Sequence, residues 1–249
     1  MAGIKQIVRK STTTRKRKPK ESPTILNQDE WLLATLEKGL TKTPRAGAKG
    51  VFYPSTLCSP CERLVYLGYN GLIPPKPIQA KVRRIFDCGD YLGNRFHKYF
   101  SDLGLLIAAE QSVKHTDPTI SGRLDYLIKH EKHGRSIIEL KSINDKGFKL
   151  LTTDPKIDHF LQLQIYLNLV GMEHGVVLYE NKNDQQVKAF EVFQNTLVWD
   201  GLLDKCFRIM SMVDTPKVCT GEKYCRCREV EHGTKRSSKM ESVNGITEG

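Results

Sequence analysis

Two carboxylates and one amine lie on neighbouring strand-like segments in the middle of the chain. Asp125 is part of SGRLDYLI, and Glu139 and Lys141 belong to SIIELKS, with thirteen residues between the two acids. If these segments pair as a hairpin, one divalent cation can reach both carboxylates, and Mg²⁺ prefers hard oxygen ligands and keeps several waters. Lys141 shares a strand face with Glu139, where its ammonium can orient an attacking water or stabilise charge developing on phosphate. The three residues therefore predict metal-dependent hydrolysis of a phosphodiester.

A second copy of the Glu-x-Lys pattern occurs at Glu180 and Lys182. That copy lies where an apolar strand gives way to a polar turn, which favours a structural role. The first copy is embedded in an apolar, buried-type strand, where an unpaired charge is costly without a functional reason. Gly122, which shortly precedes Asp125, also permits close approach of another part of the chain. From spacing alone, a salt bridge on an exposed strand face stays the alternative for the first copy.

Hydrophobic periodicity indicates which elements position these residues. Apolar residues at three- and four-residue steps, with Pro and Gly near the ends, predict helices at 29–40, 57–69, 78–103, 153–170 and 195–212. Runs of β-branched and aromatic residues predict strands at 105–114, 119–130, 135–143, 175–181 and 187–193. This order is typical of an α/β fold, a mixed central sheet flanked by helices, with an N-terminal helical extension and a C-terminal cysteine tail.

The composition is that of a globular chain with a basic N-terminal arm. Hydrophobic residues make up 39% of the 249, and the net charge is +11. Residues 1–22 carry eight basic side chains and one glutamate, a net charge of +7, and should be disordered. We therefore expect an arm at 1–22, one domain at 23–227 and a disordered tail at 228–249. Without an apolar run long enough to cross a bilayer, and without a secretory signal, the sequence predicts a soluble cytoplasmic protein.

The basic arm is a candidate contact for nucleic acid. Its densest stretch is RKRKPK, which includes Arg15, Lys16, Arg17 and Lys18. Such a cluster binds phosphates without sequence preference and loses affinity as the salt concentration rises. It also matches a nuclear import signal, so a nuclear location stays open beside the cytoplasmic one. A purely solubilising role is the alternative.

Residues 52–227 resemble the PD-(D/E)XK nuclease superfamily, and within it the RecB-like branch. The pattern of that branch is a histidine on a helix, then Gly-x-x-Asp, then Glu-x-Lys, then Gln-x-x-x-Tyr on the next helix. The matching residues are His97, Asp125, Glu139, Lys141, Gln162 and Tyr166. The resemblance implies a restriction-endonuclease-like core built around the mixed sheet.

The resemblance also implies an activity and a role for each matching residue. His97 and the two acids would hold Mg²⁺ or Mn²⁺, and Lys141 would help the attacking water. Gln162 and Tyr166, one helical turn apart, would contact the substrate strand or position the lysine. Glu110, on the preceding strand, is a further acidic candidate. The implied protein is a deoxyribonuclease, an exonuclease on single-stranded or frayed DNA in recombination, repair or replication, with a helicase or recombination protein as partner.

Two other functions compete with this interpretation. One is a non-catalytic nucleic-acid-binding module on a nuclease fold, against which the complete set of two acids and a lysine argues. The other is a restriction-type endonuclease, which the sequence favours less because no separate base-reading domain is visible.

The cysteines provide a second candidate site. An intracellular chain of this size rarely uses disulfides, so cysteines that cluster near both ends of the body indicate metal ligation. The sequence is similar to iron–sulfur members of the RecB-like branch, including the CRISPR-associated exonucleases. This resemblance implies that a 4Fe-4S cluster is held by Cys61, Cys219, Cys225 and Cys227. Zinc is the alternative for four thiolates.

Three further cysteines complete the seven in the chain. Cys58 forms a Cys-x2-Cys pair with Cys61 and is a possible substitute for Cys225 or Cys227 as the fourth ligand. Cys88 and Cys206 lie on helix patterns, and we expect both to be buried apolar side chains.

Overall fold

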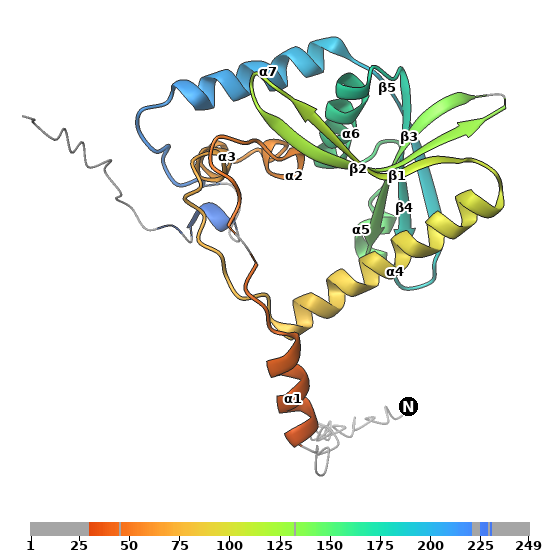
Figure 1. Cartoon of the computed structure of the whole chain (residues 1–249), viewed down its shortest axis with the longest axis horizontal. Helices are drawn as coiled ribbons and strands as arrows, with labels where there is room; N and C mark the ends of the chain where they lie inside the picture. Colours follow the sequence, from red (N-terminus) through yellow and green to blue (C-terminus); the bar gives the residue numbers. More distant parts are fainter. Residues whose placement is uncertain (1–29, 45, 132, 221–224, 229, 231–249) are drawn as a thin grey trace, which may run out of the picture.

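The five expected strands form one sheet in the computed structural model, which describes residues 30–44, 46–131, 133–220, 225–228 and 230 (Figure 1). The strands are β1 (Leu106–His115), β2 (Ile120–His130), β3 (Gly134–Ile143), β4 (His174–Asn181) and β5 (Val187–Phe193). Their order in the sheet is their order in the chain, and only β3 and β4 are parallel. A parallel pair needs a long crossover, which here contains two helices. The expected α/β class with a mixed sheet is confirmed.

The helices follow the expected periodicity with two differences. They are α1 (Glu30–Leu40), α2 (Pro54–Leu57), α3 (Glu62–Tyr69), α4 (Ala80–Asp102), α5 (Asp145–Lys149), α6 (Ile157–Val170), α7 (Thr196–Ser211) and the short 3-10 helix η1 (Arg226–Arg228). The single helix expected at 57–69 is wrong, because the chain breaks between α2 and α3 and Cys61 becomes the N-cap of α3. Pro60, which lacks a backbone N–H, lies in that break. The sequence also did not predict α5, which is too short to show a periodicity.

Two hydrophobic cores lie on the two faces of the sheet. The larger one packs α2, α3, α6 and α7 against one face. The smaller one packs Leu92 and Phe96 of α4 against Tyr126 and Ile138 on the other face. Ile137 belongs to the larger core and its neighbour Ile138 to the smaller one, as alternation along a strand requires. Figure 1 shows α6 and α7 across the sheet from α4.

The N-terminal half of α4 extends beyond the sheet. Val82, Ile85 and Phe86 are exposed, although their spacing continues the apolar stripe of the buried half. Figure 1 shows this half reaching toward α1, against which it packs. Cys88 lies in the same half and is exposed, so the expectation that it is buried is wrong. Periodicity gives the spacing of an apolar stripe but not the element that covers it.

Some of the sequence predictions lie outside the described residues. They are the basic arm at 1–22 with its cluster at 15–18, and the tail beyond residue 230. Arg228 and Val230, which the sequence analysis assigns to that tail, contact the body through Cys219 and Arg63. Within the described ranges, each helix is too short or too polar to cross a lipid bilayer.

Candidate active site and cysteine centre

Strands β2 and β3 separate at the two acidic residues, and we call this point the fork. Their paired residues run from His130 and Gly134 up to Tyr126 and Ile138, where the pairing ends. Beyond the fork the backbone N–H of Leu140 donates to Asp125 Oδ2 at 2.8 Å. A carboxylate thus takes the place of a strand partner, and the open edge gives the acids room to meet a ligand.

Beyond the fork, Gly122 allows β2 to pack closely against the larger hydrophobic core. A Cβ atom at this position would lie 2.8 Å from side-chain atoms of Pro54 and of Tyr166. Only glycine fits such a close approach. The close packing expected around Gly122 is therefore present, and it brings β2 against α2 and α6.

Glu139 is a fully buried carboxylate at the fork. It forms an ion pair with Lys141, yet neither of its oxygens has a hydrogen-bond partner of normal geometry among the described residues. Burial raises the pKa of Glu139 to about 7, and the negative charge of Asp125 raises it further against the opposing effect of Lys141. Burial also raises the pKa of Asp125. A buried acid without hydrogen bonds is costly, and a bound cation would offset that cost.

A hydrogen-bonded chain of side chains runs from Lys141 into α6. Lys141 Nζ donates to Gln162 Oε1 at 3.4 Å, and Gln162 Nε2 donates to Tyr166 Oη at 3.3 Å. Gln162 and Tyr166 are one helical turn apart, so both reach the same side of α6. Burial raises the pKa of Tyr166, which keeps its hydroxyl neutral. The structure therefore brings four of the expected site residues into one connected group: Glu139, Lys141, Gln162 and Tyr166.

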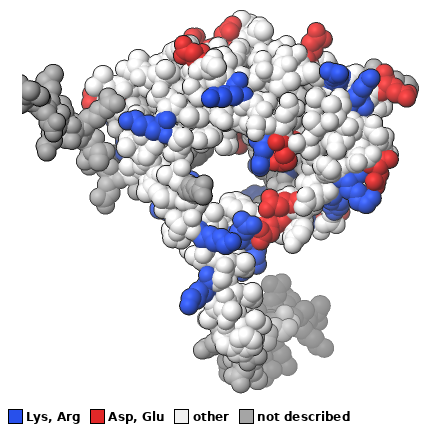
Figure 2. Space-filling model, viewed as in Figure 1, with Lys and Arg blue, Asp and Glu red and all other residues white. Residues whose placement is uncertain are grey.

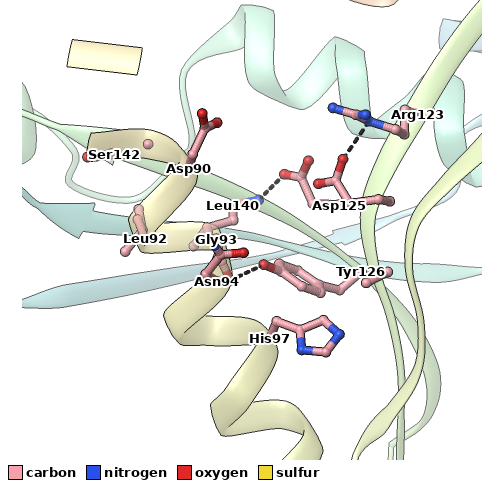
Figure 3. Close-up of a pocket in the computed structure, with 13 residues that line it drawn as sticks. Asp90, Leu92, Gly93, Asn94, His97, Arg123, Asp125, Tyr126, Leu140 and Ser142 are labelled. Atoms are coloured by element: carbon pink, nitrogen blue, oxygen red, sulfur yellow. Dashed lines mark hydrogen bonds and ion pairs between the residues drawn. The ribbon is translucent and has the colours of Figure 1, made fainter. Parts of the chain in front are cut away.

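A cavity of about 420 Å³ lies between α4 and the sheet. His97 lines it from α4 and Asp125 from β2, as Figure 3 shows. The hydroxyl of Tyr126 donates to the carbonyl of Gly93 at 2.6 Å, which ties α4 to β2 one turn before His97. The helical histidine and the strand acid thus border one space.

The three expected metal ligands lie in the same region, but their donor atoms do not come close enough together to form a compact ligand group. Among the described residues, only four cysteines form a group of three or more potential ligands whose donor atoms all lie within 4.8 Å of one another. His97 and Asp125 line the cavity, whereas Glu139 lies buried behind it and is ion-paired. Mg²⁺ keeps several waters, so not every one of the three must bind it directly.

The cavity also contains polar residues that the sequence analysis missed. Asp90 and Asn94 line it from α4, and their spacing from His97 puts all three on one helix face. This spacing in the sequence could have indicated that Asp90 and Asn94 belong to the site. Glu110, the further acidic candidate expected from the sequence, lines the cavity as well, has a φ of 53°, and pairs with Arg123 at 2.5 Å. A positive φ at a non-glycine residue is strained, and such strain is concentrated at functional sites.

The second Glu-x-Lys copy does not enter this site. Glu180 is buried and pairs with Arg95 Nη2 at 2.5 Å, while Lys182 is exposed. The ion pair joins the end of β4 to α4. Glu180 therefore has the structural role that the sequence analysis favoured for it.

The sulfur atoms of four cysteines meet at the N-terminal end of α3. Cys61, Cys219, Cys225 and Cys227 all lie with their Sγ atoms within 4.8 Å of one another, and three of the four are buried. The Sγ atoms of Cys219 and Cys227 are 3.4 Å apart. This donor set fits a bound metal, as the sequence analysis expected.

The other cysteines lie elsewhere. Cys58 is buried, but it does not belong to the group of four, so the structure does not assemble the alternative set in which it replaces Cys225 or Cys227. Its thiol lies beside Lys205 instead, and burial raises its pKa to about 12. Cys206 is fully buried in the larger core, as expected.

Arg63 binds the C-terminal segment to α3 beside the cysteines. It is buried, and its guanidinium donates to the carbonyls of Cys227 at 3.1 Å, Pro216 at 2.7 Å and Val230 at 3.1 Å. In the part of the chain that the structure describes, no carboxylate pairs with it. A buried cation of this kind favours negative charge nearby, which four thiolates would supply.

Comparison with known proteins supports the fold. No family model and no curated protein sequence matches the chain, whereas 29 chains of solved structures do. One is SSO0001, with a TM-score of 0.51 and 19% identity over 82% of this chain and 95% of that one. Others are an alkaline exonuclease from Laribacter hongkongensis, at 12% identity over 74% and 91% of the two chains, and its complex with dAMP, at 14%, each with a TM-score of 0.47. The chain therefore shares its fold with SSO0001.

Proposed function

We propose that the chain is a metal-dependent deoxyribonuclease whose active site lies at the fork. One observation carries the proposal. Glu139 is fully buried, and apart from the ion pair with Lys141 its oxygens have no hydrogen-bond partner among the described residues. A salt bridge kept only for stability gains little from such burial, because desolvation of both charges offsets the attraction. A divalent ion bound beside Asp125 and Glu139 would offset the cost of burying the Glu139 carboxylate.

Mg²⁺ or Mn²⁺ would be held by Asp125 and Glu139 at the fork, with His97 across the cavity. A bound ion of this kind polarises a phosphate and lowers the pKa of a water that it coordinates. Both acids must be ionised to bind it, and Lys141 favours their ionised forms. Burial raises the pKa of both acids, whereas the positive charge of Lys141 favours their ionised forms near neutral pH.

Lys141 would act on the attacking water and on the phosphate. Gln162 accepts one of its hydrogen bonds, and Tyr166 in turn accepts one from Gln162, which fixes the direction of the ammonium. An ammonium held in place beforehand stabilises developing negative charge without reorganising during the reaction. Gln162 and Tyr166 would therefore be positioning residues for the lysine.

We further propose a DNA strand end as the substrate. Figure 2 shows an opening between α4 and the rest of the molecule, with acidic and basic side chains at its edge. An opening beside the active-site cavity suits a single-stranded or frayed end better than an uninterrupted duplex. The helicase or recombination partner that the resemblance implies stays a prediction.

The test uses end-labelled linear single strands, linear duplexes and circular single strands with Mg²⁺ or Mn²⁺. We expect shortening of linear strands, resistance of the circles, and a loss of about 10³-fold in rate for Asp125→Ala. Asp200→Ala, an exposed acid on α7, is the matched control and should cleave normally.

Three outcomes would contradict the proposal in different ways. Undiminished cleavage by Asp125→Ala would exclude the fork as the active site. Cleavage of circles would make the protein an endonuclease. Salt-sensitive DNA binding without cleavage under either metal would instead support the non-catalytic binding module.

A further inference from the structure

The four cysteine sulfurs lie closer together than an iron–sulfur cluster allows. Every pair is within 4.8 Å, and Cys219 Sγ is 3.4 Å from Cys227 Sγ. We propose that this centre binds a single tetrahedral zinc ion, and not the 4Fe-4S cluster that the family resemblance implies. The assignment holds whether or not the chain cleaves DNA.

The size of the sulfur group distinguishes the two cofactors. Zn–S bonds of about 2.3 Å place the four sulfurs of a tetrahedral site about 3.8 Å apart. In a 4Fe-4S cluster each thiolate binds a different iron at a corner of the cube. The sulfur-to-sulfur distance is then larger than around one ion by the iron–iron separation. The observed spacing matches one ion and leaves no room for a four-iron cube at the centre.

Contacts within the protein hold this spacing. Arg63 Nε donates to the carbonyl of Cys227 at 3.1 Å, and an Arg228 N–H donates to the carbonyl of Cys219 at 2.6 Å. The backbone N–H of Arg228 also donates to the carbonyl of Cys225 at 3.1 Å, which closes the turn that carries two of the ligands. These bonds fix the backbone at three of the four cysteines, from which the sulfurs converge.

Contacts also hold Cys61, the first of the four ligands along the chain. Cys61 is the N-cap of α3, and its sulfur accepts a hydrogen bond from the backbone N–H of Leu64 at 3.4 Å. The positive end of the helix and this N–H both favour a thiolate. Four thiolates around Zn²⁺ carry a net negative charge, which the buried guanidinium of Arg63 balances. A site with four protein ligands has no open position for substrate, so the zinc would be structural.

The experiment measures the metals in the full-length protein after parallel aerobic and anaerobic purification. We expect about one zinc ion per chain and no visible absorption in either preparation. A brown anaerobic preparation with about four irons per chain would overturn the proposal. So would a folded protein without bound metal.

Variants localise the ion and separate it from the nuclease activity. Cys225→Ser should lose most of the zinc, whereas Cys58→Ser, a buried cysteine of the neighbouring turn, should retain it. Cys88→Ser, an exposed position, is a second control in case Cys58→Ser fails to fold. Asp125→Ala should also keep its zinc, so that failure of the nuclease proposal leaves the zinc result intact. Loss of zinc from Cys88→Ser, or its retention in Cys225→Ser, would contradict the assignment.

Discussion

At the scale of single residues, burial of the Glu139 carboxylate has a cost in stability that can be measured without catalysis. Burial raises the pKa of Glu139 from 4.5 to about 7. In the unfolded chain the carboxyl loses its proton near 4.5, whereas the folded protein retains it until about 7. The unfolded state is therefore favoured progressively as the pH rises between these values, and the folded state loses stability there.

The first prediction concerns this pH dependence in the presence of a chelator that removes Mg²⁺ and Mn²⁺. Denaturation of the wild type should show a contribution from Glu139 that decreases by about 3 kcal/mol from pH 4.5 to pH 7. Glu139→Gln should lack this contribution, because an amide does not ionise. Added Mn²⁺ at pH 8 should restore stability to the wild type alone. Parallel pH profiles for the two proteins would contradict the burial argument.

The second prediction uses the repeated Glu-x-Lys pattern as an internal control. Lys141→Ala should lower the cleavage rate by about 10²-fold or more with little effect on DNA binding, because under the proposal its ammonium would act on the reacting phosphate. Lys182→Ala should cleave like the wild type. Rates are measured under single-turnover conditions and binding in Ca²⁺. Equal losses of cleavage rate in the two variants would mean that Lys141, like Lys182, contributes only a general positive charge.

At the scale of elements, the position of α4 decides where His97 lies. Arg95 pairs with Glu180 at 2.5 Å, and Tyr126 donates to the carbonyl of Gly93 at 2.6 Å. Both contacts join α4 to the sheet within two turns of the histidine. The helix is therefore fixed where the metal would bind, while its N-terminal half extends beyond the sheet.

The third prediction tests this anchoring. Glu180→Gln removes the partner of a half-buried arginine and should lower the free energy of unfolding by about 2 kcal/mol, between the values typical of exposed and buried pairs. It should also weaken Mn²⁺ binding, because His97 shares the helix. Urea denaturation and Mn²⁺ titration are the measurements, and Glu191→Gln on the exposed side of β5 is the control. A normal Mn²⁺ affinity would show that α4 keeps its place without the pair.

At the scale of the whole molecule, the cysteine centre joins segments that are far apart in the chain. Cys61 begins α3, whereas its three partners follow α7. A metal bound by the folded but not the unfolded chain adds its binding free energy to stability. The centre would therefore hold the helical layer on one face of the sheet together.

The fourth prediction concerns Arg63. Replacing it by Met leaves three carbonyls without their donor and removes the cation beside the thiolates, so zinc should dissociate faster to a competing chelator and Tm should fall. Arg63→Lys keeps the charge but cannot make all three bonds, and should be intermediate. Zinc release is followed with a colorimetric indicator. Identical release rates in all three proteins would show that Arg63 has no role in holding the centre.

Much of the fold could be predicted because its signals are local. Each of the five strands lies within a residue or so of the expected limits, since β-branched runs ending at turn residues depend only on neighbours in the chain. The same holds for the end of α6, where Gly171 has a φ of 68°, the left-handed conformation that favours glycine. The break between α2 and α3 was missed although Pro60 is a local signal for it, whereas the exposure of Cys88 depends on what packs against α4.

The sequence by itself predicted which residues would form the two candidate sites. The order of His97, Asp125, Glu139, Lys141, Gln162 and Tyr166, and the clustering of cysteines, are properties of the chain. Only the tertiary structure decided that the strands part at the acids, that Glu139 lacks hydrogen bonds, and that four sulfurs gather within 4.8 Å. These features depend on distances between residues that are far apart in the chain. The packing of whole elements sets such distances, and a local sequence pattern does not predict them.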